Sequence, residues 1–307
     1  MLWSLREQSG GNHQEEFPLK RHIAGLACAA MTVLSVPALA STATAQASDP
    51  ISALRSQFKT GLGVKTVDTT KVRGIAGNAV VAKRTGVFQF GTSGIRASDH
   101  TAQLRIKPSD LGLSEESTTD EDSQLTKLFT GMTKPERVVR IKNATYISGG
   151  MFGEFLPADK TWLRFDTTAG ATGSLSQLVN VAEPSTLKAL LAHTTVKRAG
   201  TYAGKITLGE LHKVSPWFRV SLGTPLDRKN AKVSLSWKLY LGADKLAKRL
   251  TTSYPAGSKD AVTVDTSYTG WGSKVTVAAP PADQVAKLSE LEFDGKVEPP
   301  FTVLNPG

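Results

Sequence analysis

The sequence predicts an α+β fold in which a large curved antiparallel β-sheet, a half-barrel, is covered on its concave face by a few helices. Stretches of alternating apolar and polar residues recur along the chain, which indicates strands with one buried face. Apolar residues at helical spacing occur in only a few short segments. Since so long a sheet has to curl and only one face is apolar, we expect the helices on the concave side.

The segment 1–45 has the pattern of a secretory signal peptide behind an atypical polar N-terminal extension. A basic start at Lys20 precedes an apolar run over 23–36, and small residues suited to cleavage follow up to Ala40 and Ala45. The run is shorter than the roughly 20 residues that a helix needs to cross a bilayer. We therefore expect an exported protein, extracellular or associated with the cell envelope, that is cleaved near Ala40 or Ala45.

Cys28 is the only cysteine of the chain and lies inside this segment. Gly25 stands where a lipid-modified cysteine is preceded by leucine, so we expect no lipid anchor at Cys28. The mature chain would then have no thiol for a disulfide or a metal site, and its stability has to come from a packed core.

The chain has a formal net charge of +10 at pH 7. Because we expect export, nucleic acid is excluded as a partner, and the charge suits an anionic membrane surface. A basic, solvated surface with no partner explains the same charge. The acidic run over 114–122 has the opposite sign and the composition of an exposed loop.

The first helix is predicted over 48–58, because Asp49 is a suitable N-cap and Pro50 suits the first helical position. The elements expected after it are strands over 79–94 and 100–107, a helix over 123–132, and strands within 136–166 with turns at Gly149-Gly150 and at 157–159.

The second half begins with two helical runs and then returns to strands. The runs contain Leu175, Leu178 and Val179, and, behind Pro184, Leu187, Leu190 and Leu191. The chain after Gly200 is expected to be β-rich, with the clearest alternation over 232–241 and the last strands over 260–268 and 274–278. Pro280-Pro281 is expected to open a final helix that carries Val285, Leu288 and Leu291. We expect one domain over 48–295, a tail over 296–307, and a monomer.

The sequence contains no convincing catalytic or metal-binding motif. His100, His193 and His212 are far apart and lack metal-ligand spacing. The stretch "GTSGI" over 91–95 lacks the second glycine of a nucleophile elbow. We therefore expect no catalytic residue, no cofactor, no metal and no enzyme activity.

Four segments can be compared as an ordered set: "NATYISGGMFGEFLPADKTWLRFD", "LSQLVNVAEPSTLKALLAHTTVKRAGTYAGKITL", "SLSWKLYLGADKLAKRL" and "VDTSYTGWGSKVTVAAPPADQVAKL". The set resembles the actinobacterial LppX/LprG-type proteins of the LolA-like lipoprotein-carrier superfamily. This resemblance implies a half-barrel, covered by helices, that holds acyl chains of lipids or of lipid-modified proteins in a hydrophobic cavity.

The function expected on this basis is a non-enzymatic carrier or sensor of acyl chains at the cell envelope, with a lipid or an acylated protein as its partner. The candidates for the cavity lining are apolar residues of strands and of one helix: Leu104, Ile106, Leu163, Phe165, Leu187, Leu190, Leu191, Ile206, Leu208, Leu235, Trp237 and Leu239. Each of them also fits an ordinary core.

The alternative function is an envelope-stress regulatory module that binds a protein partner such as an anti-sigma factor, because the expected fold also resembles the fold of such regulators. A continuous apolar cavity would favour the carrier, and a filled core with an exposed apolar patch would favour the interaction module.

Overall fold

The structure, a computed structural model, describes residues 49–73, 78–106, 124–166, 176–222, 225–255 and 260–291. These residues belong to one compact unit over Ala45–Gly307. The expected signal segment, the acidic run over 114–122, Leu175 and the tail over 296–307 lie outside them. Export, cleavage and the domain bounds therefore stay predictions.

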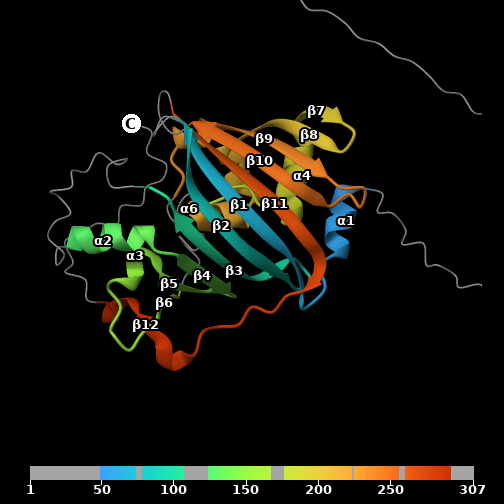
Figure 1. Cartoon of the computed structure of the whole chain (residues 1–307). Helices are drawn as coiled ribbons and strands as arrows, with labels where there is room; N and C mark the ends of the chain where they lie inside the picture. Colours follow the sequence, from blue (N-terminus) through green and yellow to red (C-terminus); the bar gives the residue numbers. More distant parts are fainter. Residues whose placement is uncertain are drawn as a thin grey trace, which may run out of the picture. The chain divides into compact units, whose positions relative to one another are not determined.

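Among the described residues, twelve strands form one open, curved sheet in the order β12-β6-β5-β4-β3-β2-β1-β11-β10-β9-β8-β7 (Figure 1). The pairs are antiparallel except for β12 on β6. This confirms the predicted α+β class with a large antiparallel sheet. The strands are β1 (Leu62–Arg73), β2 (Asn78–Phe90), β3 (Ile95–Leu104), β4 (Glu136–Ile141), β5 (Ala144–Gly149), β6 (Trp162–Phe165), β7 (Thr194–Arg198), β8 (Thr201–Thr207), β9 (Ser234–Leu241), β10 (Ala247–Pro255), β11 (Ala261–Lys274) and β12 (Val285–Lys287).

Buried and exposed residues alternate along β9, as the sequence predicts. Leu235, Trp237 and Leu239 are buried on one face, which we call the inner face, whereas Ser236 and Lys238 are exposed on the outer face. The helices α4 (Pro184–Ala192), α5 (Leu208–Val214) and α6 (Pro216–Leu222) supply partners for the inner face. Figure 1 shows α4 and α6 behind the sheet formed by β1, β2, β9, β10 and β11.

The first helix, α1 (Pro50–Ser56), has the predicted cap. The side-chain Oδ1 of Asp49 accepts from the N–H groups of Ile51 at 2.8 Å and Ser52 at 3.0 Å, which satisfies two free donors of the first turn. The predicted helix over 123–132 is α2 (Gln124–Thr133), and α3 (Gly150–Gly153) follows β5 directly. Together α2 and α3 lie at the end of the sheet formed by β3, β4 and β5 (Figure 1).

Two predictions for the middle of the chain are wrong. The described part of the run around Leu178 and Val179 is irregular, because side chains of the segment itself bond its backbone. The stretch 208–222, expected to be β-rich, forms α5 and α6. A capping box at Thr207 and Glu210 starts α5, so Leu208 begins a helix and does not lie on a strand.

The predicted C-terminal helix is also wrong. Pro281 is followed by a 3₁₀ turn over Ala282–Gln284, the strand β12, and a second 3₁₀ turn over Leu288–Glu290. Val285, Ala286 and Lys287 pair with β6, which would otherwise present an unpaired edge. The helical spacing of Val285, Leu288 and Leu291 is overridden by this pairing. Of the strand expected over 274–278, only Lys274 lies on a strand, at the end of β11, and 275–278 are irregular.

Trp271 lies in a bulge at the end of β11. Gly270 and Gly272 have φ values of 63° and 76°, which favour glycine, and the pairing with β1 shifts register at this point. The indole stacks on Tyr268 and Phe90 and its Nε1 donates to the carbonyl of Ala247 at 2.8 Å. These contacts show that Trp271 holds the end of β11 against β2 and β10.

Candidate functional site

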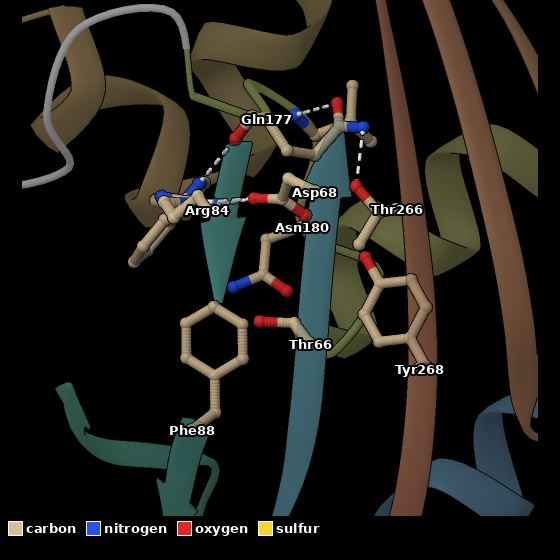
Figure 2. A pocket seen from close by; sticks show the side chains of 10 residues that line it. Thr66, Asp68, Arg84, Phe88, Gln177, Asn180, Thr266 and Tyr268 are labelled. Carbon is tan, nitrogen blue, oxygen red and sulfur yellow. Dashed lines mark hydrogen bonds and ion pairs between the residues drawn. The ribbon is translucent and has the colours of Figure 1, made fainter. Parts of the chain in front are cut away.

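A layer of buried polar side chains lies between the inner face of the sheet and the segment Ser176–Glu183 (Figure 2). We call it the polar layer. It consists of Thr66, Asp68, Arg84, Gln177, Asn180, Thr252, Thr266 and Tyr268, each at most 5% exposed. Its members come from β1, β2, β10 and β11 and from the covering segment, so it joins the two layers of the fold.

Gln177 is the main connection between these layers. Its Nε2 donates to Thr266 Oγ1 at 3.0 Å, and its Oε1 accepts from Thr252 Oγ1 at 2.8 Å. The backbone carbonyl of Gln177 accepts from Trp217 Nε1 of α6 at 2.9 Å. One residue thus holds two strands and one helix in register, since buried polar groups need partners.

Asp68 and Arg84 form an ion pair within the polar layer. Arg84 Nε donates to Asp68 Oδ2 at 2.6 Å, and the guanidinium lies 5.7 Å from the Trp217 ring centroid. Asp68 Oδ1 and Asn180 Nδ2 have no hydrogen-bond partner among the described residues, and both residues line a cavity of about 10 Å³. This volume is at the lower limit for one water molecule, so the polar layer does not accommodate an acyl chain.

Glu183, at the end of the covering segment, bonds α4 and α6 together. Its carboxylate accepts from Ser215 Oγ at 2.5 Å, from the N–H of Trp217 at 2.7 Å and from Thr186 Oγ1 at 2.8 Å. Burial raises the pKa of Glu183, and these hydrogen bonds together with the charge of Arg140 oppose that rise. The three donors orient the carboxylate, which indicates a positioning role in the fold.

The three histidines that the structure describes, His100, His193 and His212, lie in separate surroundings. Burial lowers the pKa of His100 well below its usual value, with Arg84 acting in the same direction, so the ring is neutral beside Thr66 at 3.3 Å. His193 lies 3.3 Å from Glu210 on the exposed surface. Within the described ranges, no group of three or more histidine, cysteine, aspartate or glutamate side chains is placed to hold a metal ion.

Most of the predicted lining residues gather in one apolar cluster between the sheet and α4–α6. The members are Leu187, Leu190, Ile206, Leu208, Leu235, Trp237 and Leu239, each at most 3% exposed, with Ile106 and Leu191 packed against them. Their neighbours include Leu211 and Phe218, so the structure describes this region as packed core. A lining role for these residues stays a prediction.

The other predicted residues lie towards the opposite edge of the sheet. Leu163 is buried on β6, with Ile147 and Ala286 as its neighbours in the pairing. Phe165 packs against Phe152, with 5.6 Å between the ring centroids. Leu104 is half-buried and lines a second cavity, described next.

This second cavity, the side cleft, has a volume of about 30 Å³ and lies where α2 and α3 cover the end of β3 and β4. It is lined by Ala102, Leu104, Met132, Lys134, Glu136, Gly150 and Met151. Two methionines give it a soft, adaptable wall. Gly131 lets α2 approach α3 closely, because a Cβ there would lie 2.7 Å from the carbonyl oxygen of Gly150.

Glu136 is the one charged residue of the described cleft lining for which no described partner is found. Its side chain has no hydrogen bond or ion pair with any described residue, and burial raises its pKa from 4.5 to about 7. Lys134, by contrast, bonds Glu154 with 2.7 Å between Nζ and Oε1. The side cleft therefore combines an apolar wall with one carboxyl group that titrates near neutral pH.

Comparison with solved structures finds weak similarities. The LolA superfamily protein NE2245 from Nitrosomonas europaea is 8% identical with a TM-score of 0.31, over 72% of this chain and 91% of that chain. The hypothetical protein CT021 from Chlamydia trachomatis is 10% identical with a TM-score of 0.28, over 76% of this chain and 98% of that chain. No family model matches, and no curated protein matches. Similarities this weak carry no argument about function, and neither protein is described as LppX/LprG-type.

The polar layer and the side cleft are the two features that sequence reasoning missed. The polar residues of β1 gave no apolar alternation to detect, and the partners of Gln177 lie 75 and 89 positions away. A detectable signal for the cleft was the pair of methionines, Met132 and Met151, flanking β4 and β5. No helix in the described part of the chain is both long and apolar enough to cross a membrane.

Proposed function

We propose that the protein binds an acyl chain of a lipid or of a lipid-modified protein, as a non-enzymatic carrier or sensor of the LolA-like kind, and that the side cleft is where the chain enters. The observation that carries this proposal is the composition of the cleft. Leu104, Met132 and Met151 offer an apolar wall, and the charged groups Lys134 and Glu136 lie beside it. An amphiphile needs both kinds of surface.

The side cleft has to widen before it can hold an acyl chain, and the packing of α2 and α3 allows this. Met151 and Phe155 form a small apolar cluster with Met132, Phe152 and Leu291 that is separate from the main core. A unit that packs separately from the main core opens at a lower free energy than the core itself. We therefore place the opening motion at α2 and α3.

The main core has a different role in this proposal. Its apolar residues and the polar layer hold the sheet and α4–α6 together while α2 and α3 move. Gln177 bonds the sheet across this interface, and Glu183 bonds α4 to α6 within the helix layer, which together favour a fixed rather than a mobile helix layer.

The proposal is tested with a neutral, apolar fluorescent probe, N-phenyl-1-naphthylamine, on purified and delipidated protein. Leu104→Trp fills the cleft, and we expect it to weaken probe binding by at least about tenfold because the ring occupies ligand volume. The matched control is Gln103→Trp, since Gln103 is exposed on the outer face of the same strand. The proposal would be refuted if the folded wild-type protein bound no apolar probe.

Export and an anionic membrane surface as a partner belong to the same proposal. The signal pattern before Ala40 and Ala45 and the net charge of +10 support them.

A further inference from the structure

We propose that Glu136 makes the side cleft selective for amphiphiles whose head group donates hydrogen bonds or carries a positive charge, such as acylglycerols and long-chain amines, over free fatty acids. This inference rests on the proposed function, since it concerns the ligand of the same cleft.

The position of Glu136 is the first step. It is the first residue of β4, where it pairs with Ala102 of β3 and Gly149 of β5. Its carboxyl group packs against α3, because a Cβ on Gly150 would lie 2.8 Å from Glu136 Oε2. The absence of a side chain at Gly150 thus leaves room for the carboxyl group beside the apolar wall of the cleft.

The second step is the lack of a partner. A buried carboxyl group normally accepts hydrogen bonds or pairs with a cation. Glu136 does neither with any described residue, and the neighbouring residue Arg137 is held by Asp99 at 2.7 Å on the outer face. Glu136 is half-buried, and no described residue competes with a ligand for its acceptor oxygens.

The third step concerns the other charges around the cleft. Lys134 and Glu154, from the segments before β4 and after α3, neutralise each other. Arg105, at the end of β3, is exposed and makes no ion pair with a described residue. Burial is the one cause that shifts the pKa of Glu136, so none of these cations compensates its charge.

These charges determine which head groups the cleft binds favourably. A hydroxyl or ammonium group donates to the free oxygens of Glu136 and relieves the cost of its burial. A fatty-acid carboxylate brings a second negative charge to the same place, and like charges a few ångströms apart repel strongly in a poorly solvated site.

The experiment displaces N-phenyl-1-naphthylamine with three ligands of equal chain length: 1-monolauroylglycerol, dodecylamine and dodecanoic acid. At pH 8.5 we expect the amine and the glyceride to bind the wild type at least about tenfold more tightly than the acid. At pH 5.5 protonation of Glu136 should remove most of the advantage of the amine.

The variant Glu136→Gln keeps the size of the side chain and removes its charge. We expect it to bind dodecanoic acid about tenfold more tightly than the wild type at pH 8.5, and dodecylamine more weakly. The control is Asp159→Asn, which changes the net charge equally at an exposed position and should leave the order of the ligands unchanged.

The outcomes separate this inference from the proposed function. Probe binding with the same order of ligands in the wild type and in Glu136→Gln would overturn the selectivity and leave the acyl-chain site intact. Failure of the folded wild type to bind the probe would overturn both. The inference is supported if the preference for dodecylamine over dodecanoic acid is reversed in Glu136→Gln but not in Asp159→Asn.

Discussion

Replacing Gln177 by methionine tests whether the polar layer holds the helices on the sheet. The substitution keeps the length of the side chain but removes the groups that bind Thr252 Oγ1 and Thr266 Oγ1. Both hydroxyls lose this partner in a region at most 2% exposed. Each stranded hydroxyl costs about 1–3 kcal/mol, so we expect the two together to lower the free energy of unfolding by about 2–6 kcal/mol.

A triple variant provides the matched control. In Gln177→Met with Thr252→Val and Thr266→Val, the stranded hydroxyls are replaced by methyl groups of similar shape, which is nearly neutral. We expect a remaining loss of about 1 kcal/mol, because the N–H of Val179 still lacks the Gln177 acceptor.

Both variants are measured by urea unfolding followed by circular dichroism, and the comparison requires the same dependence on denaturant as in the wild type. The reasoning fails if the triple variant is as unstable as the single one, because the cost would then not lie in the stranded hydroxyls.

Three further predictions concern the core, the cleft and processing. Leu235→Ala should lower the free energy of unfolding by about 2–5 kcal/mol, because Leu235 is fully buried, whereas Ser236→Ala should change it little; equal effects would contradict the packed core. The raised pKa of Glu136 means that the native state holds its proton more tightly than the unfolded state. Its contribution to stability is therefore complete below about pH 4.5 and decreases as the pH rises through about 7. Glu136→Gln should flatten this part of the stability profile, and an unchanged profile would refute the assignment. Intact-mass analysis of the exported protein should give a chain that begins near Ser41 or Gln46 without an acyl group, and a lipid-modified Cys28 would contradict this.

The parts of the fold that sequence predicts well depend on neighbours along the chain. The cap at Asp49 lies within three residues of its donors, and the alternation of β9 needs only the residues of that strand. The capping box at Thr207 and Glu210 is equally local, so α5 could have been found from the same rules.

The parts that sequence misses depend on distant partners. From the sequence alone, Asp68 would be expected on the surface, because its partner Arg84 lies on another strand, β2. The spacing that predicted a C-terminal helix likewise contains no information about the edge of β6, with which that segment pairs. The candidate lining residues show the same limit. Alternation identifies an apolar face, but it does not distinguish a face covered by other side chains from one that is open to a ligand.

The pairing of β1 with β11 has a consequence for the order of folding. Val67 lies opposite Ser267, 200 positions later in the chain, and this pair sits near the middle of the sheet order. Contacts so distant in sequence form slowly, because a long loop has to close before they can form. The two halves of the sheet therefore stay unjoined until the ribosome has made β11, about 200 residues after β1.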